Sequence, residues 1–247
     1  SKIWKENDQS YPIFNLDNYG TTSKRSNQMN FLFIDGKTIT DELKLILNQD
    51  KTIVLILRNS DEHSVMVHRK FIIDMFDLGI TAPVILNRSY NDISNLDFQI
   101  KSSIDIGSLY IDGLGDGVWV DFGSEYGIVN QTVFGILQAS RMRISKTEYI
   151  SCPSCGRTLF DLQETTSKIR EVTNHLKGVK IGIMGCIVNG PGEMADADYG
   201  YVGTGNGYIS LYKGQEVVKR NIPTDGAVEA LIGLIKEHGD WIDPVSV

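Results

Sequence analysis

Short apolar, β-branched runs alternate with amphipathic stretches of helical period between about residues 30 and 142. The runs predict buried strands, because continuous apolar segments of this length are typical of strands covered on both faces. They lie at residues 30–34, 52–57, 82–86 and 107–111. The amphipathic stretches predict helices, since their apolar residues recur every three or four positions. They lie at about residues 39–47, 67–76, 92–103 and 127–142.

Repeated βα units of this kind predict a parallel sheet with right-handed crossovers, the arrangement of α/β proteins. Four units make either an open sheet or part of a barrel. The glycine-rich residues 113–117 (Gly-Leu-Gly-Asp-Gly) are interpreted as a sharp turn after the last strand. They are a weak dinucleotide motif, because no G-x-G-x-x-G opens a helix there.

The pattern changes after Lys146. A short strand is predicted at residues 147–150, and a helix follows with Leu159, Leu162, Ile169, Val172 and Leu176 on one face. Further elements are predicted as a strand at 179–184, a hairpin of 208–212 with 216–220, and a last helix at 227–238. This order predicts an α+β domain. We therefore expect an α/β domain at residues 1–145 and a smaller domain at 146–247.

Composition narrows the class of protein. The 247 residues are 41% hydrophobic and 22% charged, as in an ordinary globular protein. No apolar run approaches the roughly 18–20 residues of a membrane span, and the first residues do not form a signal peptide. A net charge of −7 argues against general nucleic-acid binding. The missing initiator Met and the weak pattern of the first thirty residues suit a piece of a longer protein, although removal of a Met before Ser1 would give the same start.

The three cysteines fall in two places, which indicates a metal or iron–sulfur site. Cys152 and Cys155 form a Cys-Pro-Ser-Cys turn, and Cys186 follows the strand predicted at 179–184. Residues 187–192 (Ile-Val-Asn-Gly-Pro-Gly), too rich in glycine and proline to continue a helix or strand, connect Cys186 to Glu193. Three thiolates and one carboxylate on two turns suit a metal or cluster better than a disulfide scaffold.

Two other chemistries fit part of this pattern. A Cys-x-x-Cys pair at a helix start is typical of thiol oxidoreductases, but that reading leaves Cys186 unexplained. A zinc-stabilised interaction module needs a fourth ligand, which is normally Cys or His. Asp196 and Asp198 are possible ligands, and Glu193 lies closest to Cys186. The four histidines have no spacing relation to the cysteines: His63, His68, His175 and His238.

Two segments resemble the hydroxymethylbutenyl diphosphate synthase family of the non-mevalonate isoprenoid pathway. They are residues 151–157 (Ser-Cys-Pro-Ser-Cys-Gly-Arg) and 184–198 (Met-Gly-Cys-Ile-Val-Asn-Gly-Pro-Gly-Glu-Met-Ala-Asp-Ala-Asp). The resemblance is dense over residues 105–244. It implies a [4Fe–4S] cluster held by four ligands, namely Cys152, Cys155, Cys186 and Glu193. It also implies that Asn189 approaches the substrate at the open iron.

The family opens methylerythritol cyclodiphosphate reductively, so the resemblance implies an iron–sulfur oxidoreductase that takes electrons from ferredoxin or flavodoxin. It implies the bacterial cytoplasm or the plastid stroma, and a cluster domain at residues 146–247. Trp119 and Asp121 stand where short members place two diphosphate contacts, and an aspartate would repel a phosphate. Residues 1–145 therefore resemble an incomplete inserted domain, with the substrate-binding N-terminal barrel missing and this chain inactive alone.

Basic residues gather in sequence before and after the first two cysteines: Arg141, Arg143, Lys146 and Arg157. We expect them to face either an acidic ferredoxin or the substrate diphosphate. For Arg141 and Arg143, a solvated helix end that complements the helix dipole explains the sequence equally well.

Overall fold

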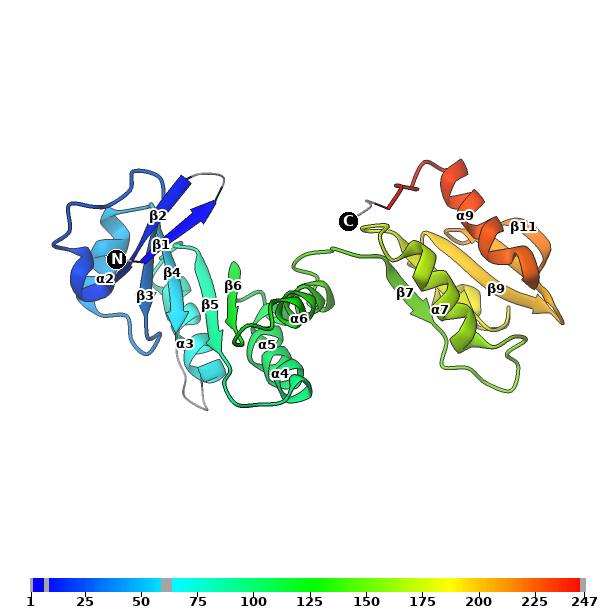
Figure 1. The fold of residues 1–247 in the computed structure, drawn as a ribbon, viewed down its shortest axis with the longest axis horizontal. Helices are drawn as coiled ribbons and strands as arrows, with labels where there is room; N and C mark the ends of the chain where they lie inside the picture. Colours follow the sequence, from blue (N-terminus) through cyan, green and yellow to red (C-terminus); the bar gives the residue numbers. More distant parts are fainter. Residues whose placement is uncertain (1, 7–8, 59–63, 245–247) are drawn as a thin grey trace. The chain divides into compact units, whose positions relative to one another are not determined.

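A computed structural model describes residues 2–6, 9–58 and 64–244 of the chain (Figure 1). The chain divides into two compact units, residues 1–143 and 144–247. The roles predicted for these two parts of the sequence, an inserted domain and a cluster domain, stay predictions.

The first unit alternates strands and helices through its described residues. Its elements are β1 (Lys2–Glu6), β2 (Gln9–Asn15), α1 (Leu16–Tyr19), β3 (Asn30–Ile34), α2 (Asp41–Gln49), β4 (Ile53–Arg58), α3 (Ser64–Asp77), β5 (Val84–Ser89), α4 (Asn95–Ser102), the π-helical turn η1 (Ser103–Gly107), α5 (Ser108–Ile111), β6 (Gly117–Asp121) and α6 (Tyr126–Ala139).

The strands form one sheet in the sequential order β1-β2-β3-β4-β5-β6. Neighbours from β2 to β6 run parallel, and β1 is antiparallel to β2. The α/β class predicted for this part is confirmed, and so are the strands expected near residues 30, 52 and 82. Since β1 and β6 are its two ends, the sheet is open rather than a closed barrel within the described residues.

The strand predicted at residues 107–111 is wrong, because this segment is helical. Its apolar residues are buried at Ile106, Leu109 and Tyr110 but exposed at Ile104 and Ile111, which is a helical spacing. The strand that pairs with β5 is β6, so the glycine turn at residues 113–117 precedes a strand instead of following the last one.

The weakly patterned start of the chain also contains elements that the sequence did not indicate. Strand β2 pairs with β3, and Ile13 lies opposite Phe31. The short helix α1 follows, and Tyr19 at its end is buried and donates a hydrogen bond to Asp50 at 2.6 Å. Tertiary pairing therefore extends the predicted sheet at its first edge.

The two faces of this sheet differ. One face packs against the helices, and its core contains Leu32, Leu55 and Leu86 together with Leu43 of α2 and Phe71 of α3. The opposite face has a second apolar cluster, which contains no helical residue in the described part of the chain. Its buried members are Tyr11, Ile13, Phe31 and Ile56. Helix α6 lies beside this second face, because its Val129 and Val133 line a pocket together with Ile13, Phe31 and Ile56.

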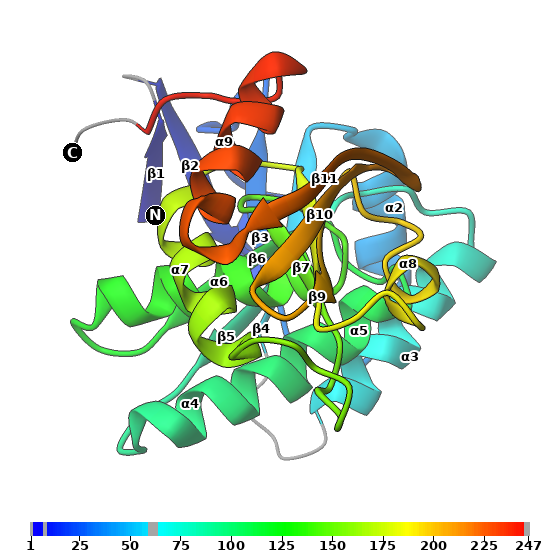
Figure 2. The same ribbon diagram turned by 90° about the vertical axis from the view of Figure 1, so that its right-hand side faces the viewer.

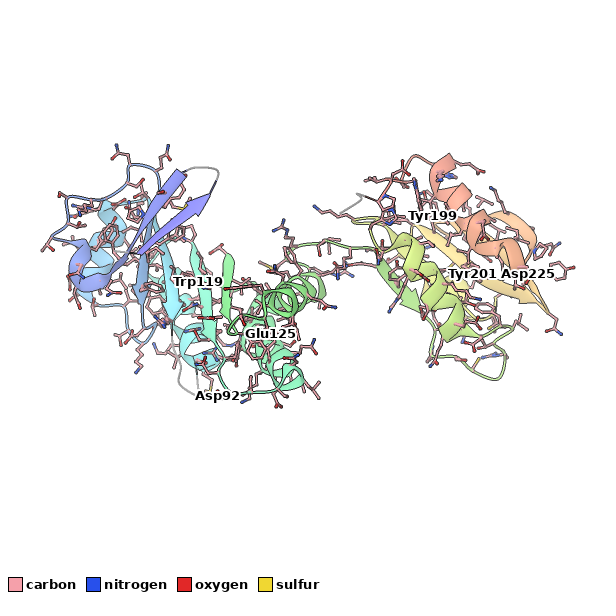
Figure 3. The ribbon with its side chains drawn as sticks, in the orientation of Figure 1. Asp92, Trp119, Glu125, Tyr199, Tyr201 and Asp225 are labelled. Carbon is pink, nitrogen blue, oxygen red and sulfur yellow. The ribbon has the colours of Figure 1, made fainter. Side chains whose placement is uncertain are left out.

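The sheet is curled, and side chains from β3 and β6 meet on this face. The rings of Phe33 on β3 and Trp119 on β6 have centroids 5.8 Å apart, and two strands lie between β3 and β6. Trp119 is labelled on β6 in Figure 3. A curled sheet agrees with the partial-barrel alternative.

The second unit is built around a mixed sheet. Its elements are β7 (Glu148–Ser151), α7 (Leu162–Thr173), β8 (Lys180–Met184), α8 (Gly190–Glu193), β9 (Tyr199–Gly205), β10 (Tyr208–Lys213), β11 (Glu216–Pro223), the 3₁₀ turn η2 (Thr224–Gly226) and α9 (Ala227–Glu237). The strand order is β11-β10-β9-β8-β7. Strands β7, β8 and β9 run parallel, whereas β10 is antiparallel to both neighbours. The predicted α+β class is confirmed.

Strand β9 was missed by the sequence reasoning, because its three glycines (Tyr-Gly-Tyr-Val-Gly-Thr-Gly) resemble a loop. Its Tyr199 and Tyr201, labelled in Figure 3, are buried in the core beneath α7 and α9. Residues 187–192 do not continue β8, as expected from their glycines and proline, and residues 190–193 form the single helical turn α8, which the sequence reasoning did not indicate. Pro191 suits the first turn, where its missing N–H costs no hydrogen bond.

Helices α7 and α9 cover one side of the strands of this unit, and α8 lies on the other (Figure 2). The larger core joins Leu162 and Ile169 of α7 with Leu231 and Ile235 of α9. The smaller core beneath α8 contains Met184, Met194 and Val202. No helix in the described part of either unit is long and apolar enough to cross a membrane.

Candidate metal centre

The three cysteines meet because β7 and β8 are parallel neighbours. Ser151 at the end of β7 pairs with Ile183 near the end of β8. Cys152 follows Ser151 directly, and Cys186 comes two residues after Met184, where β8 ends. Parallel strands present their carboxyl ends at the same edge of a sheet, so the two cysteine loops leave the sheet side by side.

A pocket of about 110 Å³ lies between these loops, within the second unit. All five residues predicted for the site line it: Cys152, Cys155, Cys186, Asn189 and Glu193. The remaining lining residues are Pro153, Ser154, Arg157 and Gly190. Cys155, Asn189 and Glu193 are exposed, whereas Cys152 and Cys186 are half-buried.

Backbone and guanidinium groups surround the thiols with hydrogen-bond donors. The Gly185 N–H donates to Cys152 Sγ at 3.3 Å. The Arg157 backbone N–H, followed by its guanidinium, hydrogen-bonds the thiolate of Cys155 and lowers the pKa of that thiol below its ordinary value. Ser154, between the two cysteines of the first loop, has a left-handed backbone with φ of 63°. The hydrogen bonds from Gly185 and Arg157 favour the thiolate form of the cysteines, which is the form that binds metals.

The turn that carries Asn189 and Glu193 is fixed against the sheet by Met194. The Glu193 N–H donates to the Asn189 carbonyl at 3.0 Å, which closes the α8 turn. Met194, the next residue, is fully buried. A Cβ atom at Gly182 on β8 or at Gly200 on β9 would lie 2.6 Å from its side chain. Both glycines are therefore needed for α8 to approach the strands this closely.

Other predicted residues lie away from the pocket. Of the four basic residues near the first cysteines, Arg157 lines it and the other three do not: Arg141, Arg143 and Lys146. Arg143 instead lies over the ring of Phe134, with 5.1 Å between the guanidinium carbon and the centroid. Trp119 and Asp121 lie on β6 in the first unit.

The histidines contribute nothing to the pocket within the described residues, and His63 lies outside them. His68 is buried on α3, where burial lowers its pKa to about 4. The ring of His175 packs edge-on against Trp241, and His238 hydrogen-bonds the Leu234 carbonyl at 2.9 Å.

The geometry of the pocket can be compared with the two alternatives, a thiol oxidoreductase and a zinc-stabilised module. All three thiols are free, and α7 begins only at Leu162, so the Cys-x-x-Cys pair does not lie at a helix start as thioredoxin-like pairs do. Within residues 2–6, 9–58 and 64–244, no group of three or more His, Cys, Asp or Glu side chains lies close enough to hold a single metal ion. The cysteines and Glu193 surround one pocket without converging on one point.

Sequence reasoning missed one residue of the site, Thr158. Its Oγ1 accepts a hydrogen bond from the Cys155 N–H at 3.1 Å. The available signal was its position three residues after Cys155, since a threonine hydroxyl commonly bonds a backbone group three residues away.

These features define the second unit as an α+β domain with a thiol-rich pocket at the carboxyl edge of its parallel strands. Residues 148–237 match the model of the GcpE protein C-terminal domain. The chain as a whole is similar to part of 4-hydroxy-3-methylbut-2-en-1-yl diphosphate synthases, which confirms the resemblance found in the sequence.

The enzyme of Parabacteroides distasonis, named as the flavodoxin type, is 49% identical over 242 residues, which are 98% of this chain and 40% of that protein. The Bacteroides fragilis (strain ATCC 25285) enzyme is 46% identical over 99% of this chain and 39% of its own length. The chloroplastic ferredoxin type of Oryza sativa subsp. japonica is 55% identical over 168 residues, 67% of this chain and 23% of that protein. The chain thus spans about 40% of the length of these bacterial relatives.

Proposed function

We propose that this chain carries the iron–sulfur part of an enzyme that makes 4-hydroxy-3-methylbut-2-enyl diphosphate in isoprenoid biosynthesis. The reaction is a two-electron reductive ring opening of 2-C-methyl-D-erythritol 2,4-cyclodiphosphate with loss of water. One observation supports it above the others: three cysteines and Glu193 line a single pocket inside the region matched by the GcpE C-terminal family. The names of the relatives, which align along nearly the whole chain, agree with it.

The residues of the pocket fit a [4Fe–4S] cluster. Thiolates are the usual ligands of iron in such clusters, and Cys152, Cys155 and Cys186 would supply three of them. Glu193 would supply the fourth ligand. Because these side chains surround a pocket of about 110 Å³ rather than a point, they suit a group larger than one ion.

When bound, the cluster supplies electrons one at a time and an iron that acts as a Lewis acid toward the leaving hydroxyl. The three thiolates would hold the cluster, with the Gly185 N–H directed at the sulfur of Cys152. Glu193 is exposed on α8 and would be a harder, more easily displaced ligand than the thiolates, which would leave one iron open to a substrate oxygen. Asn189, exposed at the start of the same turn, orients the substrate by hydrogen bonding.

The remaining partners lie outside this domain. Ferredoxin or flavodoxin delivers the electrons, as the relatives' names indicate for those enzymes. An N-terminal barrel of the same protein holds the diphosphate. The first unit is an inserted, incomplete barrel-like domain, and its curled, mostly parallel sheet of consecutive strands supports this assignment. The site of action is the bacterial cytoplasm, or the plastid stroma if the source is a plant.

Anaerobic reconstitution tests the proposal. We expect about four irons and four sulfides per chain, with broad absorption near 400 nm. A single bound zinc with no sulfide and no visible absorption would refute it and favour a zinc-stabilised interaction module. A reversible Cys152–Cys155 disulfide that cycles without Cys186 and Glu193 would instead indicate a thiol oxidoreductase.

A further inference from the structure

Thr158 closes the loop that carries the first two cysteines. Its Oγ1 accepts a hydrogen bond from the Cys155 N–H at 3.1 Å and lies 3.2 Å from the Ser154 hydroxyl oxygen. In the other direction, the Thr158 N–H donates to the Cys155 carbonyl at 2.9 Å. This reciprocal pair of bonds fixes the backbone of Cys155, which is otherwise exposed.

The same side chain packs against the second cysteine loop. A Cβ atom at Gly185, the residue before Cys186, would lie 2.8 Å from both Cγ2 and Oγ1 of Thr158. The Gly185 carbonyl oxygen would in turn lie 2.5 Å from a Cβ atom at Gly203 on β9. The backbone of Gly185 is therefore held between Thr158 and β9, with no room for a side chain.

Both the backbone N–H and the carbonyl of Gly185 form hydrogen bonds with the segment that carries the first two cysteines. Its N–H donates to Cys152 Sγ at 3.3 Å, and its carbonyl accepts from the Leu159 N–H at 3.1 Å. An N–H group directed at a cluster thiolate stabilises the more negative, reduced state, and so raises the reduction potential. The position of Gly185 thus affects the electronic properties of the site as well as its shape.

We propose that Thr158 is a positioning residue: it fixes the spacing of the two cysteine loops and holds the Gly185 N–H on the Cys152 sulfur. The role rests on the proposed iron–sulfur function, because its consequence is a higher reduction potential. Thr158 bonds the first loop through its hydroxyl and contacts the second loop through the bare Cα of Gly185. The two parts of this contact can be tested separately.

The hydroxyl is tested by amide hydrogen exchange on the 247-residue chain without a cluster. We expect the Cys155 N–H to exchange at least tenfold faster in Thr158→Val, which keeps the shape but loses the acceptor. Thr158→Ser, which keeps the acceptor, should retain the protection. Thr165→Val on α7, a half-buried threonine outside the pocket lining, is the matched control. Equal exchange rates of the Cys155 N–H in wild type and Thr158→Val would overturn the proposal. If the valine variant does not fold, the exchange rates in Thr158→Ser and Thr158→Ala provide the same comparison.

The packing contact is tested by the reduction potential of reconstituted chains. Gly185→Ala places a methyl group against Thr158, so we expect a more negative midpoint potential as the N–H···S bond is lost. Adding Thr158→Ala removes Cγ2 and Oγ1 and should reverse part of that shift. If Gly185→Ala takes up no cluster, uptake regained by the double variant supports the proposal. An unchanged potential, or a double variant no better than Gly185→Ala, contradicts it.

These outcomes are separable from failure of the proposed function. The exchange measurement needs no cluster, whereas absent iron and sulfide uptake by the wild-type chain would count against the iron–sulfur proposal alone.

Discussion

At the scale of single residues, the proposed function gives the thiols and Glu193 different roles as iron ligands. Soft thiolates bind iron tightly, and a carboxylate is a harder ligand that a substrate oxygen can displace. Cys186 is half-buried after β8, while Glu193 is exposed on the single turn α8. Loss of either ligand should therefore affect the cluster differently.

We expect Glu193→Ala to assemble a cluster, and Cys186→Ala to lose it or to retain three irons. Asp196→Ala is the control, because Asp196 is an exposed carboxylate that does not line the pocket. Iron and sulfide analysis with electron paramagnetic resonance distinguishes the variants. An equal loss of iron from Glu193→Ala and Cys186→Ala would show that Glu193 is not the labile ligand.

At the scale of elements, the site lies on loops that short strands and helices hold at their ends. The first cysteine loop extends from β7 to the start of α7, so the beginning of α7 fixes its far end. Asp161 is the N-cap residue, and its carboxylate accepts a hydrogen bond from the Glu164 N–H at 2.9 Å. Such caps satisfy a helical N–H that otherwise has no partner in the helix.

Asp161→Ala should lower the free energy of unfolding of the second unit by about 1 kcal/mol, the usual cost of losing an N-cap. Glu171→Ala, an exposed change within the same helix, is the comparison and should have a much smaller effect. Denaturant unfolding followed by circular dichroism measures both. Equal midpoints for wild type and Asp161→Ala would mean that the cap contributes nothing to this helix.

At the scale of the whole molecule, catalysis needs more than the cluster. Cationic groups must hold the diphosphate in position, because positioning and charge stabilisation supply much of the rate. Trp119 and Asp121 on β6 are poor groups for that purpose, and the chain spans about 40% of its bacterial relatives. The proposed function therefore requires a substrate barrel outside this chain.

We expect the reconstituted chain alone to show no steady-state turnover with a chemical reductant. Adding the N-terminal barrel of the same protein in trans should restore measurable activity. If the chain alone turned over substrate at a rate close to that of a full-length relative, the proposal that substrate binding needs a separate barrel would be contradicted.

The sequence by itself predicted the fold classes of both parts, because buried strands and amphipathic helices follow from local periodicity. It also indicated that three cysteines and Glu193 on two loops belong to one site, and the structure places all four around one pocket; their role as iron ligands stays a prediction. It predicted residues 107–111 wrongly, because the apolar run around them suits a buried strand and a helix about equally.

Only the tertiary structure decided which residues meet. Strand β9 contains three glycines and is recognisable only through its pairing with β8 and β10. The contact between the rings of Phe33 and Trp119 in the first sheet joins residues far apart in the sequence. The site itself forms because β7 and β8 are parallel neighbours, and Thr158 joins their loops through the bare backbone of Gly185. Periodicity records which face of an element is apolar, but pairing and close approach depend on atoms brought together from distant positions in the chain.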